Sequence, residues 1–261
     1  AERAMTIAVV GGGWSGMAAA LTLAERGARV TVFEAARTLG GRARRLPLQG
    51  LELDNGQHIL LGAYAESLRL MRLAGVDPER VLLRLPLELR LEPGFRLKAP
   101  RLPAPLHVAV ALVRAAGLDW RDRRAAVRFV RMLQQRGYRL AADQPLAALL
   151  ERHAQPARVR ECLWEPLCIA ALNTPVGQAS AQVFANVLRD SLGAQRSASD
   201  LLLPRADLGT LFPDAAARRL ESRGGVVRLG TPVRRIAAAS SGFTLDADPA
   251  ESYAGSSEEP T

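Results

Sequence analysis

Cysteine, histidine, aromatic residues and long apolar runs are all scarce in this chain of 261 residues, and each shortage excludes a class of protein. The two cysteines, Cys162 and Cys168, form neither a disulfide framework nor a metal-binding spacing, and three scattered histidines do not indicate a zinc site. No metal is therefore expected. No segment reaches the roughly 18 apolar residues of a membrane-spanning helix, and the N-terminus lacks the layout of a signal peptide. A cytoplasmic location is the default expectation.

Positive charge is concentrated in one segment. Residues 101–139 contain nine arginines against two acids, Asp119 and Asp122, which places +7 of the net +9 there. Asp119 is a suitable N-cap for a basic amphipathic helix over about residues 119–136. Its arginines indicate either a solvated face of a core helix or peripheral contact with an anionic membrane surface. Nucleic acid is disfavoured because no binding motif accompanies them. The two faces of this helix hold Arg121, Arg124, Arg128 and Arg131 on one side and Ala126, Phe129, Val130 and Leu133 on the other.

The N-terminus has the pattern of a nucleotide-binding βαβ unit. Thr6–Val10 predicts a buried strand, residues 14–26 predict a helix, and residues 29–34 predict a second strand. Between the first strand and the helix lies the G-x-G-x-x-G spacing of Gly11, Gly13 and Gly16. In such a turn the first glycine permits the tight bend, the second lets a pyrophosphate approach, and the third lets helix and strand pack closely. The pyrophosphate would lie at the helix N-terminus.

Glu34 follows Gly11 by 23 residues, at the end of the second predicted strand. An acid at this spacing accepts hydrogen bonds from a ribose, and its charge disfavours the 2′-phosphate of NADP. A glycine turn alone is weak support for a nucleotide site, but here the strands, the helix and the acid accompany it. A structural βα turn without a nucleotide remains the alternative.

Two later segments narrow the type of nucleotide site. Gly40-Gly41-Arg42 can bring backbone N–H groups and a cation to a pyrophosphate from the side opposite the helix. Asp54-Asn55-Gly56-Gln57-His58 can place tight backbone beside a flat cofactor ring. Together with the βαβ unit, these segments resemble the flavin monoamine oxidase and phytoene desaturase superfamily.

Further segments resemble one branch of that superfamily, the squalene-associated FAD-dependent desaturases, which are hydroxysqualene dehydroxylases of bacterial hopanoid synthesis. The resemblance runs through residues 54–64 and 164–175 and covers roughly residues 5–240. It implies FAD as cofactor and an apolar isoprenoid substrate. It also implies the following cofactor-binding residues: Gly11, Gly13, Ser15 and Gly16 at the pyrophosphate, Glu34 at the adenosine ribose, Gly41 and Arg42 as a second clamp, Gly56, Gln57 and His58 near the isoalloxazine, and Val233 at the adenine.

Two reactive side chains, His58 and Cys168, have structural explanations as well as functional ones. His58 can be a satisfied core histidine, and Cys168 is better explained as a packed thiol than as a nucleophile. No catalytic residue can be assigned from the sequence.

The expected fold class is α/β, with a Rossmann-like FAD-binding lobe interrupted by a largely helical substrate domain that contains a small antiparallel sheet. The lobe comprises residues 1–85 and 224–245, the insertion residues 86–223, and a disordered tail residues 246–261. Members of the resembled family close the flavin site with a C-terminal Gly-Asp segment. Nothing after Phe243 is similar to it, so a C-terminally truncated form is expected.

The function implied by the resemblance is reductive removal of the hydroxyl of hydroxysqualene to give squalene. Three alternatives stay open. A carotenoid- or phytoene-type desaturase and an amine oxidase share the same flavin motifs, and a non-catalytic fragment would keep the fold without the flavin. Oligomeric state and electron donor cannot be read from the residues.

Overall fold

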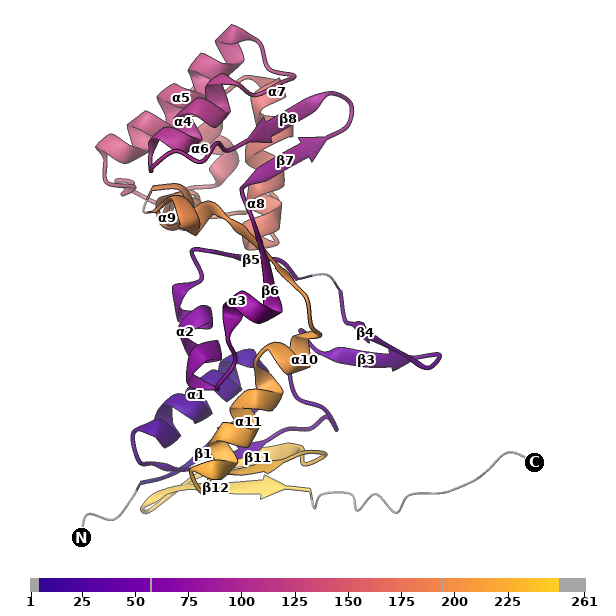
Figure 1. The fold of residues 1–261 in the computed structure, drawn as a ribbon. Coiled ribbons are helices and arrows are strands. Elements are labelled where there is room, and N and C mark those ends of the chain that lie inside the picture. Colours follow the sequence, from indigo (N-terminus) through magenta and orange to yellow (C-terminus); the bar gives the residue numbers. More distant parts are fainter. Residues whose placement is uncertain (1–4, 57, 194, 249–261) are drawn as a thin grey trace. The chain divides into compact units, whose positions relative to one another are not determined.

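The computed structural model describes residues 5–56, 58–193 and 195–248, and the chain divides into two compact units (Figure 1). Unit 1 contains residues 1–59, 65–83 and 203–261, and unit 2 contains residues 60–64 and 84–202. Sequence patterning places the helical insertion at 86–223, whereas unit 2 ends at residue 202.

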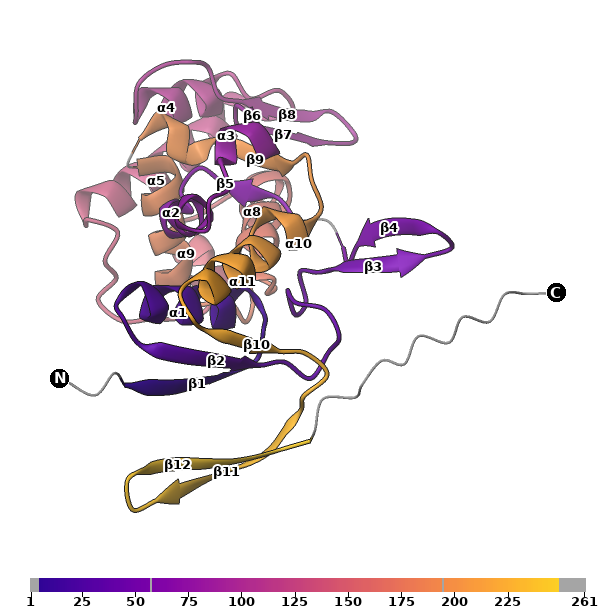
Figure 2. The same cartoon turned by 60° about the horizontal axis from the view of Figure 1, so that its bottom comes forward.

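Unit 1 is built on a parallel three-stranded sheet of β1 (Thr6–Val10), β2 (Arg29–Phe33) and β10 (Val226–Arg228), in the order β1-β2-β10. Helix α1 (Trp14–Glu25) connects the first two strands, and Figure 2 shows α1 on one face of the sheet. The strands and helix of the predicted βαβ unit are therefore present, with Thr6 opposite Arg29 in the register.

Strand β1 is not buried, contrary to its apolar sequence. Ile7 and Val9 are half-buried, while Thr6, Ala8 and Val10 are exposed, Val10 to 49%. A Cβ on Gly16 of α1 would lie 3.6 Å from Cγ1 of Val9, so the half-buried side chains face the helix. The apolar run predicts a strand covered on both faces, as parallel strands usually are. In the structure only the helix face of β1 is covered.

Residues 203–223 belong to unit 1, and the longer of their two helices packs on α1. They form α10 (Leu208–Leu211) and α11 (Pro213–Ser222), and Pro213 stands in the first turn of α11, where its missing N–H costs no helical hydrogen bond. Glu25 at the end of α1 accepts hydrogen bonds from Arg219 at 2.8 Å and from Arg223 at 2.9 Å. These hydrogen bonds join residues that lie far apart in the sequence. The helical periodicity of residues 213–222 predicts a helix but does not predict which unit the helix packs on.

The remaining elements of unit 1 are two short helices and two hairpins. The helices are α2 (Ala65–Leu73) and α3 (Pro78–Val81). One hairpin pairs β3 (Arg45–Leu48) with β4 (Leu51–Asp54), and the other pairs β11 (Val233–Ala239) with β12 (Gly242–Ala247). The predicted disordered tail begins at 246, but Asp246 and Ala247 pair with β11; residues 249–261 lie outside the described residues.

Unit 2 is mainly helical and contains the expected small antiparallel sheet, the hairpin of β7 (Glu88–Leu91) and β8 (Phe95–Lys98). A second small sheet has the order β5-β9-β6, and β6 and β9 carry the chain across the unit boundaries. These two boundary strands are β6 (Leu82–Leu85) and β9 (Leu201–Pro204). The other elements of unit 2 are β5 (Leu60–Leu61), α4 (Leu106–Val113), α5 (Trp120–Gln135), α6 (Leu146–Arg152), α7 (Ala157–Val159), α8 (Glu165–Leu172) and α9 (Ala181–Leu188), with π-helical turns at Arg160–Trp164 and Arg189–Gly193 and a 3-10 turn at Arg196–Ser199.

The core of unit 2 contains one fully enclosed tryptophan. Trp164 packs its ring 5.2 Å from that of Phe129 and 6.4 Å from that of Phe184, centroid to centroid. Its indole N–H donates to Gln155 Oε1 at 2.8 Å, and the Gln155 amide in turn donates to the carbonyl of Ala125. Buried polar groups need such partners, so this chain of hydrogen bonds fixes how α5 and the Trp164 segment pack. Across the described ranges, every helix is too short or too polar to cross a lipid bilayer.

Together with Arg123 of α5, whose Nε is buried without a hydrogen-bond partner, His107 of α4 is an exception among the buried polar side chains described in unit 2. It is fully buried, and neither ring nitrogen has a hydrogen-bond partner among the described residues. Burial lowers the pKa of His107 below 6.5; the Arg196 guanidinium adds to this effect, and the Asp200 carboxylate opposes it. The ring is therefore neutral in the folded protein at neutral pH.

Replacing His107 with leucine is expected to reduce the loss of stability in acid. Because the folded-state pKa lies below the unfolded value of 6.5, the unfolded chain binds more protons as the pH falls through 6.5, and the free energy of unfolding decreases. The His107→Leu variant lacks this contribution. Urea unfolding at a series of pH values checks it, and an unchanged dependence on pH would contradict the assignment.

Candidate functional site

The turn between β1 and α1 has the backbone that its glycines predict. Gly11 has a φ of +104°, a conformation that strains other residues, and its N–H donates to the Phe33 carbonyl of β2 at 2.7 Å. A Cβ on Gly16 would lie 1.9 Å from the carbonyl oxygen of Gly11. Only glycine at position 16 therefore allows α1 to begin this close to the strand end.

The first turn of α1 is suited to an anion. Gly13 caps the helix without a side-chain hydrogen bond, and no acidic residue lies in the first turn. The free N–H groups there and the positive end of the helix dipole favour a negative group such as a phosphate. Ser15 lies in this turn and lines the adjacent cavity.

Glu34 fastens the glycine turn from the end of β2. Its carboxylate accepts a hydrogen bond from Gly12 N–H at 2.5 Å and another from Ala36 N–H at 2.7 Å. A carboxylate has about four acceptor positions, so room remains for hydroxyl donors. Thr231 N–H also donates to the backbone carbonyl of Glu34 at 2.8 Å, which places the chain leading into Val233 beside this acid.

The second glycine segment lies directly against the first. Gly40 N–H donates to the Gly12 carbonyl at 2.9 Å, and Gly13 and Gly40 form a parallel bridge. A Cβ on Gly41 would lie 3.2 Å from the Cα of Gly13, so the two backbones approach as glycines allow. Arg42 follows with an exposed side chain. The predicted pair of segments thus comes together around one space.

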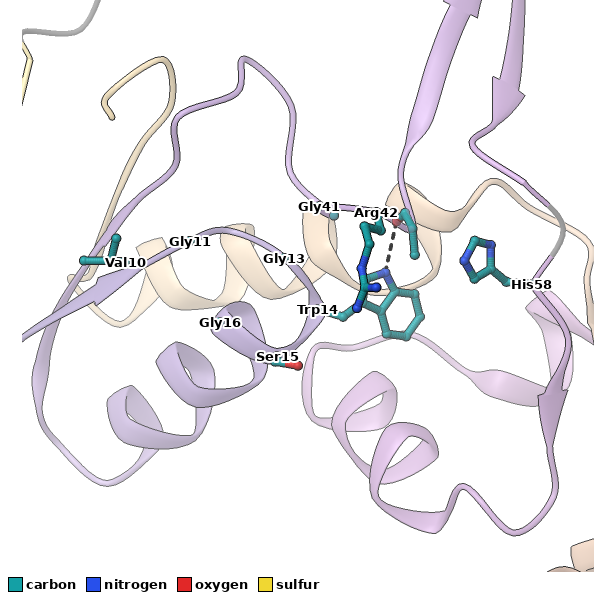
Figure 3. A pocket seen from close by; sticks show the side chains of 11 residues that line it. Val10, Gly11, Gly13, Trp14, Ser15, Gly16, Gly41, Arg42 and His58 are labelled. Carbon is teal, nitrogen blue, oxygen red and sulfur yellow. Dashed lines mark hydrogen bonds between the residues drawn. The ribbon is translucent and has the colours of Figure 1, made fainter. Parts of the chain in front are cut away.

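That space is a cavity of about 580 Å³ in unit 1, a size typical of ligand sites. Figure 3 shows the glycine turn at one end and the side chains of Trp14, Arg42 and His58 at the other. The Trp14 indole N–H donates to the Ala43 carbonyl at 3.2 Å, and its ring lies 5.3 Å from that of Phe212. The lining residues are Val10, Gly11, Gly13, Trp14, Ser15, Gly16, Gly40, Gly41, Arg42, Ala43 and His58.

Trp14 is the wall residue that sequence reasoning missed as part of the site. The sequence pattern predicts only that a helix begins at Trp14. Because Trp14 lies within the G-x-G-x-x-G turn, its side chain could have been expected to line a nucleotide cavity. Its ring is held from two directions, by the Ala43 carbonyl and by Phe212, so it is a fixed wall of the cavity.

The other predicted residues are placed less centrally. Gly56 has a φ of +85°, and its carbonyl lies 3.1 Å from His58 Nδ1. Glu34 and Val233 do not line the 580 Å³ cavity among the described residues. Val233 starts β11, and Gln57 lies outside the described residues. The site therefore brings together Gly11, Gly13, Ser15, Gly16, Gly41, Arg42 and His58.

Two remaining polar groups have structural roles. The Asp54 carboxylate accepts a hydrogen bond from Leu208 N–H at 2.9 Å, so it holds the start of α10. Cys168 of unit 2 is fully buried with its thiol 3.4 Å from the Thr174 carbonyl, and burial raises its pKa. A raised pKa disfavours the thiolate, which supports a packed thiol rather than a nucleophile.

A parallel βαβ unit with this glycine turn, its acid and a second glycine segment is the arrangement typical of dinucleotide-binding domains. The chain belongs to the flavin-containing amine oxidoreductase family, whose family model matches residues 14–256. The cofactor of this family is FAD.

Curated relatives are similar to this chain in sequence, and a solved structure is similar to it in fold. The chain is 30% identical over 238 residues to a hydroxysqualene dehydroxylase of Rhodopseudomonas palustris, covering 88% of this chain and 54% of that protein. It is 26% identical to the hydroxysqualene dehydroxylase of Zymomonas mobilis, covering 87% and 54%. An oxidoreductase structure from Methanosarcina mazei superposes with a TM-score of 0.68 at 17% identity, covering 94% of this chain and 56% of that one. The chain thus spans about half the length of these proteins.

Proposed function

We propose that unit 1 holds FAD in the cavity between its two glycine segments. The fit rests on the close approach of backbone around the cavity, because Cβ atoms at positions 16 and 41 would collide with or crowd the backbone of Gly11 and Gly13. The proposed contacts are Gly11, Gly13, Ser15 and Gly16 with the pyrophosphate, Gly41 and Arg42 with the same group from the other side, Glu34 with the adenosine ribose, Val233 with the adenine, and Gly56, Gln57 and His58 with the isoalloxazine.

Each contact has a distinct physical role. The α1 N-terminus and the Arg42 guanidinium balance the pyrophosphate charge, and Glu34 accepts from the ribose hydroxyls while it keeps the turn in shape. Bound flavin supplies two-electron redox chemistry, and the protein supplies binding, orientation and exclusion of water. Trp14 helps to exclude water because its fixed ring closes one end of the cavity.

We propose that unit 2 receives an apolar substrate. It contains a cavity of about 80 Å³ and an adjoining one of about 20 Å³, and Leu87, Leu167 and Leu192 line both. Their walls are almost wholly apolar, which suits one segment of a hydrocarbon chain; together the two cavities are smaller than a whole ligand pocket of roughly 300 Å³. Among the described lining residues of either cavity there is no carboxylate to pair with an amine.

The larger of these cavities also has two buried serines that can accept a hydrogen bond. Ser191 Oγ donates to the Val187 carbonyl at 2.6 Å, and Ser199 Oγ donates to the Arg196 carbonyl at 2.8 Å. Because each hydroxyl proton is already used, the lone pairs of each oxygen are left to accept. An apolar molecule with a single hydroxyl matches this wall better than a pure hydrocarbon.

We propose, on this match and on the two dehydroxylase relatives, that the protein reductively removes the hydroxyl of hydroxysqualene to give squalene. The reaction replaces a C–O bond with a C–H bond, consumes two electrons and releases the oxygen as water. It would serve hopanoid synthesis in the cytoplasm, at the inner face of the cytoplasmic membrane, where so apolar a substrate is found.

Incubation of the FAD-loaded protein with hydroxysqualene and dithionite tests this function. Squalene is the expected product, detected by gas chromatography and mass spectrometry. Phytoene and simple amines are the comparison substrates, under air instead of dithionite. Bound, reducible flavin without squalene formation would reject the dehydroxylase assignment, and turnover of phytoene or an amine would favour the corresponding alternative. Failure to retain flavin would indicate a non-catalytic form.

A further inference from the structure

Helix α5 presents a solvent face made of arginine and one tryptophan. Ala125, Ala126, Phe129 and Leu133 are buried on the opposite side. Both nearby acids are engaged in capping: Asp119 accepts from Asp122 N–H at 2.8 Å, and Asp122 accepts from Asp119 N–H at 3.3 Å. Among the described residues of α5 no exposed side chain is acidic; the exposed side chains are Trp120, Arg121, Arg124, Arg128, Arg131 and Gln135.

Large apolar side chains are exposed on α5 and on the helix that packs against it. Trp120 is 64% exposed, and the guanidinium of Arg121 lies 5.5 Å from its ring centroid. Helix α4, which packs on α5, exposes Val113 to 56% and Leu106 to 55%. Tryptophan, valine and leucine side chains are more often largely buried. Their exposure next to a row of cations indicates a partner that is both anionic and apolar.

A basic groove adjoins the loop between the two helices. It has a volume of about 510 Å³ and is lined by the cations Arg96, Lys98 and Arg114. Glu88 pairs with Arg96 at 2.8 Å and with Lys98 at 3.0 Å, so three cations face one carboxylate. The groove keeps a positive excess that can take a phosphate group.

We propose that this surface, the α4–α5 face (Leu106, Val113, Arg114, Trp120, Arg121, Arg124, Arg128 and Arg131, with the groove at Arg96 and Lys98), docks on an anionic phospholipid bilayer. The arginines bind lipid phosphates, and Trp120, Val113 and Leu106 enter the boundary between headgroups and acyl chains. The inference rests on the proposed function in one respect, because a C30 substrate must be taken from a membrane. It goes further by naming the face and the lipid class.

Charge and shape favour a bilayer over nucleic acid. A bilayer offers phosphates and an apolar layer together, whereas a nucleic acid phosphate backbone would leave Val113 and Leu106 exposed. A row of arginines on one straight helix matches a flat anionic surface. Binding should weaken with salt, since exposed charges are screened within about 10 Å at 0.1 M ionic strength.

The test is co-sedimentation with vesicles of phosphatidylcholine alone or mixed with phosphatidylglycerol. The chain should bind the mixed vesicles and not the neutral ones. The quadruple variant with Arg121, Arg124, Arg128 and Arg131 changed to Gln should lose roughly 1000-fold in affinity, given the usual contribution of each of the four arginines near an anionic surface. Trp120→Ala should weaken binding without changing the salt dependence.

A variant with the same charge change elsewhere is the matched control: Arg26, Arg72, Arg218 and Arg235, all exposed in unit 1, changed to Gln. It should bind almost as the parent chain does, and far-ultraviolet circular dichroism verifies that both variants fold. Equal loss in both variants, equal binding to neutral vesicles, or tighter binding to an RNA duplex than to mixed vesicles would overturn the proposal. Vesicle binding needs no flavin and no turnover, so its result is independent of the proposed activity.

Discussion

Replacing Gly16 with alanine is expected to destabilise unit 1 by about 3 kcal/mol and to abolish flavin binding. The added methyl group would lie 1.9 Å from the carbonyl oxygen of Gly11, which is backbone and cannot rotate away. Either α1 shifts away from the strand or the turn opens. Both responses displace the N–H groups of the α1 N-terminus from the proposed pyrophosphate position, because Gly13, Ser15 and Gly16 lie within four residues of one another.

Gly177→Ala is the matched control for this change. Gly177 lies in unit 2, a Cβ there meets no atom within 4 Å, and its φ does not lie in the left-handed region. Urea unfolding measures the stability of both variants, and the visible absorption of the purified proteins measures retained flavin. Equal stability of the Gly16→Ala variant and the parent chain would show that the turn is not packed as described.

Glu34→Gln is expected to lower the affinity for FAD roughly tenfold or more, as expected for hydrogen bonds to a charged group. In the structure the two carboxylate oxygens accept from Gly12 and Ala36, and we propose that the same group binds the ribose. A glutamine has one acceptor oxygen, so its amide nitrogen would meet an N–H donor. The turn and the ribose contact are weakened together.

Comparison of FAD with FMN separates these two effects, because FMN lacks the adenosine ribose. Quenching of flavin fluorescence gives both dissociation constants. The Glu34→Gln variant should lose more affinity for FAD than for FMN, whereas Glu52→Gln on the exposed β4 strand should change neither. An identical loss for both flavins would assign Glu34 to the turn alone and remove it from the ribose site.

The sequence could predict the glycine site because its requirements are local. A backbone bend at Gly11, a close approach at Gly16 and an acid after the next strand are all encoded within about one βαβ unit. The hairpin at 88–98 and the capped start of α5 were predictable for the same reason: turn residues and an N-cap act on their own neighbours.

Features that depend on distant neighbours could not be predicted. The exposure of β1 is one such feature, because a run of apolar residues predicts a strand but does not predict which elements cover it. The assignment of α11 to unit 1 is another, since it depends on Glu25 meeting Arg219 and Arg223 across the chain. Asp54 belongs here too: its motif suggested a cofactor loop, and its carboxylate holds α10.

The glycine turn, Glu34 and the second glycine segment are tied together by protein hydrogen bonds alone. Gly12 is held through its N–H by Glu34 and through its carbonyl by Gly40. The conformational entropy of ordering these segments is therefore lost when the protein folds rather than when the nucleotide arrives. A ligand that meets a preorganised cradle keeps more of its interaction energy as affinity, and its association is not slowed by loop rearrangement.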